Sequence, residues 1–190
     1  MSYTEIYAVN KNGDVEEYED IQNAWRGAMA VWNILEERYL PPFRPSFLPD
    51  FVPDEKIEEH LGYKPRRCIG IDKEAMKEAM KEIWKLASNE NVSEVDTIIL
   101  CTTFDDVIVK KENIEKVINA FKEFEGDTSL KEQATILEKI LEDDECIGVA
   151  WNQTSVNADT WDIYNEDDEC LPYNINNNDE HWFLFSDLED

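Results

Sequence analysis

Carboxylates and aromatic rings occur together near the C-terminal end of the chain. Six acidic side chains lie within residues 159–169, and Trp161 and Tyr164 lie among them. The acidic residues are Asp159, Asp162, Glu166, Asp167, Asp168 and Glu169. Ordered carboxylates can replace the phosphates of a nucleic acid, and neighbouring rings supply apolar contact that charge alone lacks. We therefore predict a partner-binding surface at these eight residues.

A second set of carboxylates offers a metal site as the alternative. Asp105 and Asp106 follow one apolar run, and Asp143 and Asp144 precede another. Carboxylate oxygens are suitable ligands for Mg²⁺ or Ca²⁺, and such ions activate water in hydrolases. With forty-four acidic residues in the chain, however, adjacent carboxylates are common by chance. Our first expectation is therefore no metal and no cofactor.

Other catalytic arrangements lack the residues that they need. The only histidines are His60 and His181, and a Ser or Cys nucleophile usually needs such a base. The six glycines are isolated, and neither GxGxxG nor GxxxxGK occurs. We expect a protein that is not an enzyme, and a pairing of His181 with Cys146 or Cys170 remains the nucleophilic alternative.

The string WNQTSVNADTW, residues 151–161, allows two interpretations. In the first, Trp151 ends a core strand and the polar residues form a turn that bonds its own backbone. In the second, the string is a recognition loop beside an acidic surface. We favour the turn.

The charge is distributed unevenly along the chain. The net charge is −26, and residues 140–190 hold fifteen Asp and Glu but no Lys or Arg. Disordered acidic tails are poor in aromatics, whereas this stretch contains three Trp. We therefore expect a folded, strongly negative region that repels nucleic acid and anionic lipid and attracts a basic protein.

The remaining composition indicates a soluble cytoplasmic protein. None of the four cysteines stands in a two-residue pair spacing, so we expect reduced thiols, with Cys101 and Cys146 packed as small apolar residues. The first residues carry no signal-peptide pattern, and no run is long and apolar enough to cross a membrane.

In the N-terminal half the pattern predicts a hairpin followed by helices. Residues 4–10 alternate and meet the turn pair Asn12-Gly13, and the acidic return strand 15–21 is expected at an edge. Apolar spacing predicts a helix over 22–39 with Trp25 on its inner face. The proline-rich segment 41–53 is expected as a loop anchored by its Phe rings. Helices are predicted over 54–61, ending at Gly62, and over 72–88 with Asp72 as N-cap.

In the C-terminal half the pattern predicts alternating pairs of strands and helices. The runs 96–104 and 107–110 are read as strands in a tight hairpin, and 112–124 as a helix. Ser129 and Glu132 resemble a capping box for a helix ending near Leu141. The runs 146–151 and 181–185 are read as strands with a long irregular connection between them.

These elements predict one α+β domain, residues 1–190, with a largely antiparallel sheet and about four or five helices packed on it. The acidic, basic-free part is 140–190.

The expected function is binding of a basic partner. The protein would act as a nucleic-acid mimic of the phage or mobile-element kind, or as an immunity protein that inhibits a basic toxin. A metal-dependent hydrolase or small-ligand-binding domain is the alternative. A structural domain with a solubilising surface is the third possibility, and the oligomeric state is left open.

Overall fold

The computed structural model describes residues 2–49, 51–66, 73–104, 106–156, 160–165 and 169–185. Within these ranges the chain forms six α-helices and one seven-stranded, mostly antiparallel sheet, which confirms the α+β class. The strands are β1 (Tyr3–Asn10), β2 (Asp14–Gln22), β3 (Val107–Lys110), β4 (Cys146–Gln153), β5 (Asp162–Tyr164), β6 (Cys170–Asn174) and β7 (Trp182–Leu184). The helices are α1 (Ala28–Tyr39), α2 (Asp54–Leu61), α3 (Lys73–Ala87), α4 (Glu94–Thr102), α5 (Ile114–Glu123) and α6 (Leu130–Glu142), with a 3₁₀ turn at Lys111–Asn113.

The chain divides into two compact units. The first comprises Met1–Val31 and Ser93–Asp190 and holds the whole sheet; the second is Trp32–Val92. In the second unit, two arginines bind the proline-rich segment: Arg44 pairs with Asp54 at 2.7 Å, and Arg66 pairs with Glu36 and stacks on Phe43. Gly62 ends α2 with φ 78°, as its place after the helix predicts.

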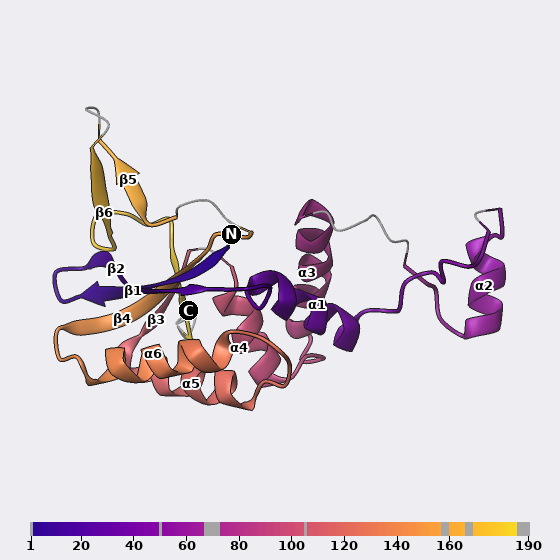
Figure 1. Cartoon of the computed structure of the whole chain (residues 1–190), viewed down its shortest axis with the longest axis horizontal. Coiled ribbons are helices and arrows are strands. Elements are labelled where there is room, and N and C mark those ends of the chain that lie inside the picture. The colour runs from indigo at the N-terminus through magenta and orange to yellow at the C-terminus, as the bar shows by residue number, and fades with distance from the viewer. Residues whose placement is uncertain are drawn as a thin grey trace. The chain divides into compact units, whose positions relative to one another are not determined.

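The sheet has the strand order β5-β6-β2-β1-β4-β3-β7 (Figure 1). All pairs except β3–β7 are antiparallel. The predicted hairpin is confirmed, and Gly13 adopts φ 90° in its turn. A bulge in β2 leaves Tyr18 without an opposite residue, because Tyr7 pairs with Glu17 and Ile6 pairs with Glu19.

One face of the sheet packs on helices. Figure 1 shows α5 and α6 side by side against the sheet, and α4 beside α5. Ile6 and Trp151 are paired across β1 and β4, are fully buried, and point to this face. The ring of Phe121 from α5 meets Trp151 edge to face at 6.2 Å. These contacts form the larger core of the first unit.

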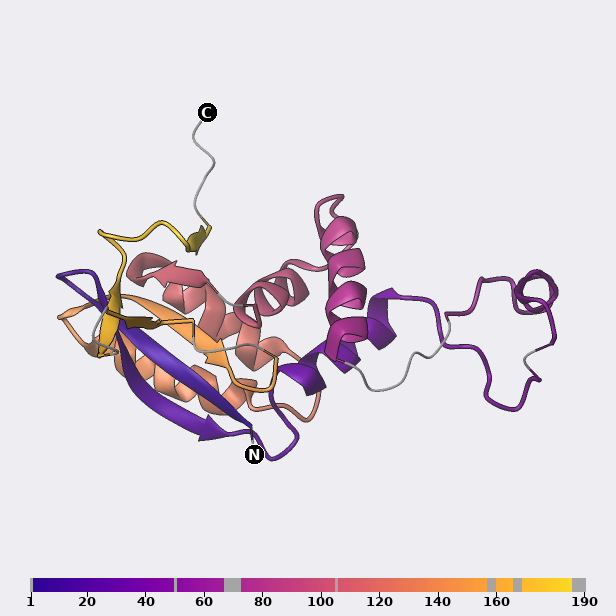
Figure 2. The ribbon, with the colours of Figure 1, turned by 90° about the horizontal axis from the view of Figure 1, so that it is seen from above.

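The opposite face carries a second core. Tyr7, Val9, Ala150 and Ile108 point to it from three neighbouring strands, as their pairing requires. They are covered by C-terminal residues that the same cluster contains, namely Trp161, Tyr173, Ile163, Ile175 and Phe183. Figure 2, seen from above, shows this yellow-orange segment lying across the sheet. The basic-free part therefore closes one side of the fold.

The apolar run 96–104 is a helix, so the predicted strand and tight hairpin are wrong. Ser93 caps α4 by accepting a hydrogen bond from Asp96 N at 3.1 Å, and the acidic Glu94 and Asp96 lie in the first turn. From Ile98 to Thr102 every residue is buried. A helix buried all round shows no amphipathic period, and an apolar run of this length then resembles a strand.

The helix predicted from residue 22 begins only at Ala28. Ala24 and Trp25 have positive φ, and the Trp25 side chain is 96% exposed instead of pointing inward. Asn23 is buried beneath this turn and accepts a hydrogen bond from Thr4 Oγ1 at 2.8 Å. The hydrogen bond between Thr4 and Asn23 stabilises a turn at the place where the apolar spacing predicted a helix.

The capping box proposed for α6 does not form. Ser129 is the N-cap residue but makes no side-chain cap bond; its hydroxyl accepts from Gln133 Nε2 instead. Glu132 pairs with Arg26 at 2.9 Å. A tertiary ion pair thus replaces the local bond that the spacing predicted.

Two further expectations need correction. The rings of Phe47 and Phe51 do not anchor the proline-rich segment, since they are 82% and 85% exposed. The connection between β4 and β7 is not irregular throughout, because it contains the hairpin of β5 and β6. Both strands are too short and too polar to show a period.

Candidate functional site

A cleft of about 400 Å³ opens where β6 separates from β2. It lies on the sheet face opposite the helices, since its β1 residues Glu5 and Tyr7 share that face. Its polar wall is formed by Glu5, Glu17 and Asp162, and its apolar wall by Tyr7, Val15, Trp161, Cys170, Leu171 and Pro172. Glu16 also lines it, but its side chain points to the other face of β2, since Glu16 pairs with Ala8 and Glu17 with Tyr7. We call this the acidic cleft.

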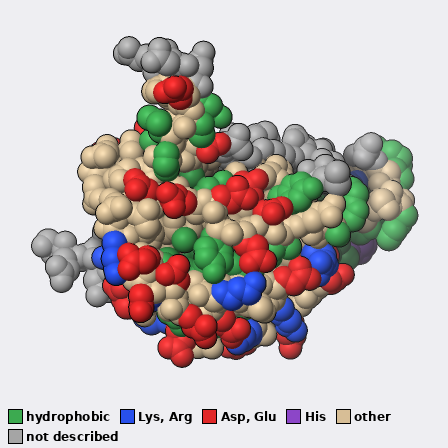
Figure 3. Space-filling view, turned by 60° about the vertical axis from the view of Figure 1, so that its left-hand side comes forward, with side chains coloured by type: hydrophobic (Ala, Val, Ile, Leu, Met, Phe, Trp, Pro, Cys, Tyr) green, Lys and Arg blue, Asp and Glu red, His purple; other side chains and the backbone are tan. Residues whose placement is uncertain are grey.

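The carboxylates of the acidic cleft differ from those over the helices in having no cationic partner. Around the helices, acidic side chains pair with lysines, as in Glu138–Lys122 at 2.5 Å and Glu19–Lys139 at 3.1 Å. Within the described ranges, no Lys or Arg forms an ion pair with a carboxylate of the cleft. Figure 3 shows red side chains among green and tan atoms below the projecting hairpin, whereas red and blue are mixed lower down.

Glu5 is held in place at the base of the cleft. Its Oε2 accepts hydrogen bonds from Asn152 Nδ2 at 2.7 Å and from Tyr7 Oη at 3.2 Å. Burial, followed by the charge of Glu5, raises the pKa of Tyr7 above its usual value, so the phenol stays protonated and donates. Two donors therefore fix one carboxylate oxygen of Glu5.

Glu17 experiences the repulsion of the cleft most directly. Partial burial raises its pKa above the ordinary 4.5, and the charges of Glu5, Asp20 and Asp162 raise it further. Asp20 also lies directly opposite Glu5 across β1 and β2, a like-charge pairing that destabilises a sheet. The ionised cleft therefore opposes folding.

Of the eight predicted partner-binding residues, the structure describes Trp161, Asp162, Tyr164 and Glu169, which lie on the β5–β6 hairpin and in the cleft. Asp162 lines the cleft, and Tyr164 is exposed on β5. Glu169 closes the hairpin, since its N–H donates to Asn165 Oδ1 at 2.9 Å and its carboxylate accepts from Asn165 Nδ2. Asp159, Glu166, Asp167 and Asp168 lie outside the described residues.

Trp161 is a wall of the cleft and not a surface ring. Only 1% of it is exposed, and its Nε1 donates to the Trp151 carbonyl at 2.9 Å. It meets Tyr173 edge to face at 5.1 Å. Trp161 therefore fixes the C-terminal segment to the sheet. The polar run after Trp151 begins with two buried strand residues, so the strand ends at Gln153 and not at Trp151. A turn follows at 154–156, as the favoured interpretation predicts, but the side chains of Asn152, Gln153 and Thr154 bond β1 and not their own backbone.

Glu5, Glu16 and Glu17 are not among the predicted site residues. The acidity of the return strand is a signal for Glu16 and Glu17, although it predicts only an edge, whereas Glu5 lies in the alternating run 4–10 and has no such signal. Beyond Val15, β2 indeed has no partner on its outer side among the residues that the structure describes. The pairing of β6 with Val15, and the bulge after Glu17, bring these carboxylates to Asp162.

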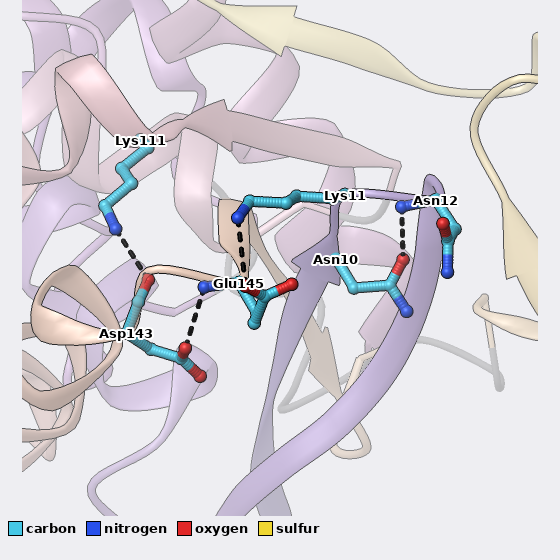
Figure 4. A network of polar contacts seen from close by, with 6 residues as sticks. All are labelled: Asn10, Lys11, Asn12, Lys111, Asp143 and Glu145. Atoms are coloured by element: carbon cyan, nitrogen blue, oxygen red, sulfur yellow. Dashed lines mark hydrogen bonds and ion pairs between the residues drawn. The ribbon is translucent and has the colours of Figure 1, made fainter.

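The carboxylates of the metal alternative are not brought together. Asp106 precedes β3 and Asp143 and Asp144 precede β4, and because these strands are antiparallel their starts lie at opposite ends of the pair. Asp143 builds a turn, as Figure 4 shows: its Oδ1 accepts from Glu145 N at 2.9 Å, and its carbonyl accepts from Lys111 Nζ at 2.6 Å. Asp105 lies outside the described residues. Across the described ranges, no group of three His, Cys, Asp or Glu side chains is arranged to hold a metal ion.

Mg²⁺, Mn²⁺ and Ca²⁺ are expected to stabilise the protein through general attraction to its net charge of −26 and not through a site at Asp106. Any stabilisation should therefore be similar for the three ions and unchanged by Asp106→Asn. Thermal unfolding in Mg²⁺, Mn²⁺ or Ca²⁺ tests this against matched NaCl, with Asp106→Asn as a second arm. A saturable shift that one ion alone produces, and that Asp106→Asn removes, would restore the metal alternative.

The described cysteines are free thiols. Cys101 and Cys146 are buried, as expected, and burial raises the pKa of Cys101 to about 12. Cys170 is exposed in the wall of the acidic cleft, and Cys68 lies outside the described residues. A buried, protonated thiol is a poor nucleophile, so Cys101 and Cys146 act in packing.

His181 packs against the aromatic residues of the second core. Its Nδ1 lies 2.9 Å from Tyr173 Oη, and its ring meets Tyr173 and Phe183 edge to face. Burial lowers its pKa below the ordinary 6.5, against the opposing charges of Asp179 and Asp106. The neutral imidazole therefore suits this position.

Acid is expected to weaken the fold through His181. A lowered folded pKa means that the unfolded chain binds the proton more readily, so stability falls as the pH drops through 6.5 towards the folded value. The variant His181→Gln should therefore gain stability relative to wild type between pH 7.5 and pH 5. Denaturant unfolding at several pH values measures this difference, with His60→Gln, at an exposed position in α2, as control. A pH-independent difference would contradict the assignment.

Comparison with protein-family models, with curated proteins and with solved structures finds no match to this chain. Among the helices of the described ranges, none has both the length and the apolar character that a bilayer crossing requires.

Proposed function

We propose that the protein is a non-catalytic, acidic binding protein that engages a basic partner through the acidic cleft. The observation that supports this most is the set of carboxylates at Glu5, Glu17 and Asp162, which share a cleft without a cationic partner in the described residues. Their mutual repulsion opposes folding, and a cationic ligand relieves it. Surface carboxylates that serve only solubility need no such convergence.

The surroundings of the cleft add apolar contact to the charge. Leu171 in its wall is 44% exposed, Tyr18, which follows Glu17 in β2, is 40% exposed, and Tyr164 is exposed on the β5–β6 hairpin. Exposed rings beside fixed charges are typical of interfaces in which a few residues carry most of the binding energy. Glu5 is already held by two donors, so the partner need not order it.

The proposal has two forms that one experiment separates. A nucleic-acid mimic occupies the nucleic-acid site of its partner, whereas an immunity protein neutralises a basic toxin. Wild-type protein, the cleft variant Glu17→Gln/Asp162→Asn and the control variant Glu115→Gln/Glu123→Gln are immobilised and exposed to an extract of the cells that make the protein. The control removes the same charge from exposed positions of α5.

We expect a basic protein to be retained by wild type and control but not by the cleft variant, and to be released by salt. Displacement by added DNA or RNA identifies the mimic form, and retention in their presence identifies the immunity form. Retention that is equal on all three surfaces would contradict the proposed role of the cleft.

A further inference from the structure

The outer edge of β2 is open next to the acidic cleft. β6 pairs with β2 only at Asp14↔Asn174 and Val15↔Tyr173, and among the described residues no strand pairs with β2 from Glu16 to Ile21 on that side. Backbone donors and acceptors on an open edge are a template for another strand. The edge and the cleft begin at the same point, where β6 leaves the sheet.

β6 changes its pairing from β2 to β5 at Tyr173. The Ile175 N–H donates to the Gly13 carbonyl on the β2 side at 2.9 Å, whereas the Tyr173 N–H donates to the Trp161 carbonyl on the β5 side at 3.2 Å. Nitrogens two apart in a regular strand face the same edge, so the strand turns between these two bonds and its ladder to β2 stops at Val15. The neighbouring Pro172 has no N–H to donate to either edge. β6 continues in pairing with β5 and leaves the place beside β2 vacant.

The charge of this edge determines what can occupy it. β2 carries Glu16, Glu17, Glu19 and Asp20 within five residues, and only Glu19 has a described ion pair, with Lys139 on the helix side. A second copy of the chain would place the same carboxylates opposite these, and like charges directly opposite destabilise a strand pair. A segment rich in Lys or Arg is complementary.

We infer that the basic partner binds by adding an extended segment as a strand along Glu16–Ile21, in the place that β6 leaves vacant, with a Lys or Arg side chain in the acidic cleft. This inference rests on the proposed function and specifies its partner chemistry. Side chains of a strand alternate between the two faces. The partner segment should therefore carry basic residues at alternate positions, which face Glu17, Glu5 and Asp162.

The cleft suits a long basic side chain. The methylenes of Lys or Arg pack against the apolar wall of Trp161, Leu171 and Pro172, while the cationic end reaches the carboxylates. Main-chain hydrogen bonds along the edge supply affinity and the alternate side chains supply specificity, as in other cases of strand addition.

The test uses a capped peptide of about eight residues in which Lys alternates with Thr. Two modified forms carry N-methyl groups on backbone nitrogens. In one form the backbone nitrogen of every Lys is methylated, and in the other the backbone nitrogen of every Thr is methylated. Side chains and charge are identical in all three peptides. In an added strand, one set of nitrogens faces β2 and the other faces solvent.

We expect the parent peptide to bind wild type in low salt. One N-methylated form should lose at least about tenfold in affinity and the other less than about threefold, because only one set of backbone nitrogens forms hydrogen bonds with β2. Equal binding of both modified forms would overturn strand addition and leave the proposed function intact if the parent still requires Glu17 and Asp162. If the variant Glu17→Gln/Asp162→Asn binds the parent peptide as tightly as wild type does, the peptide does not bind at the acidic cleft and the inferred location is wrong. If the parent peptide does not bind wild type at all, the proposed function is contradicted as well. The charges on the edge of β2 would then serve only to prevent aggregation.

Discussion

The double variant Glu17→Gln/Asp162→Asn is expected to lose at least about tenfold in affinity for a basic partner while becoming more stable than wild type. Two of the three carboxylates that converge in the acidic cleft disappear, and with them much of the attraction for a cation. Glu17 and Asp162 repel each other and Glu5 in the folded protein, so their removal should raise the free energy of unfolding by roughly 0.2–1 kcal/mol. The two effects have opposite signs, which a general loss of structure cannot produce.

The stability gain should depend on pH in a defined direction. The pKa of Glu17 is raised above 4.5 in the folded protein, so wild type loses stability as the pH rises through this value towards the folded pKa. The difference between the double variant and wild type should thus grow from pH 4 towards neutrality. Chemical denaturation at each pH measures it, and Glu115→Gln/Glu123→Gln provides the control for charge. A variant that loses both stability and binding would show that Glu17 and Asp162 serve the fold instead.

Replacement of Trp161 by Ala should cost about 3–5 kcal/mol of unfolding free energy, the usual range for a large buried ring. Trp161 is buried, meets Tyr173, and holds the C-terminal segment to β4 through the Trp151 carbonyl. For a chain of this length the melting temperature should fall on the order of 10 °C. Trp161→Phe should cost less, roughly 1–3 kcal/mol, because the ring is partly kept but the carbonyl of Trp151 loses its donor.

The matched control for this prediction is Trp25→Ala. Trp25 is almost fully exposed, so its removal should change stability by less than about 0.5 kcal/mol. Calorimetry or denaturant unfolding of the three variants measures the series. Similar losses for Trp161→Ala and Trp25→Ala would contradict the packing of the C-terminal segment on the sheet.

The elements that the sequence predicted well are those with a clear local signal. The hairpin of β1 and β2 was indicated by alternation and by Asn12-Gly13, and α2 by its end at Gly62. The helices α5 and α6 have strongly one-sided apolar faces and lie close to the predicted ranges. In each case neighbours in the sequence determine the structure.

The errors arose where tertiary contacts override the local pattern. α4 is buried on all sides from Ile98 to Thr102, so it lacks the period that identifies a surface helix. The start of α1 is delayed by the buried side chain of Asn23, which binds Thr4 on a distant strand. β5 and β6 have three and five residues, too few for alternation to be recognised.

Only the part of the candidate site that has a local sequence signal was predictable. The sequence drew attention to Asp162 and Trp161 through composition, and both line the cleft. Glu5, Glu16 and Glu17 lie about 150 residues away in the sequence and join them only through the pairing of β2 with β6. Strand register between distant segments is not visible in local patterns, and the bulge at Tyr18 shifts it further.

The most direct test of the acidic cleft as the binding site is the salt dependence of partner affinity in wild type and in Glu17→Gln/Asp162→Asn. Titration of both proteins with the alternating Lys-Thr peptide, from about 20 to about 300 mM NaCl, gives the two slopes. We expect tight, steeply salt-dependent binding by wild type and weak binding with a shallow slope by the variant, with Glu115→Gln/Glu123→Gln following wild type. Equal affinities and slopes for all three proteins would show that binding reflects net charge alone and would contradict a site at the cleft.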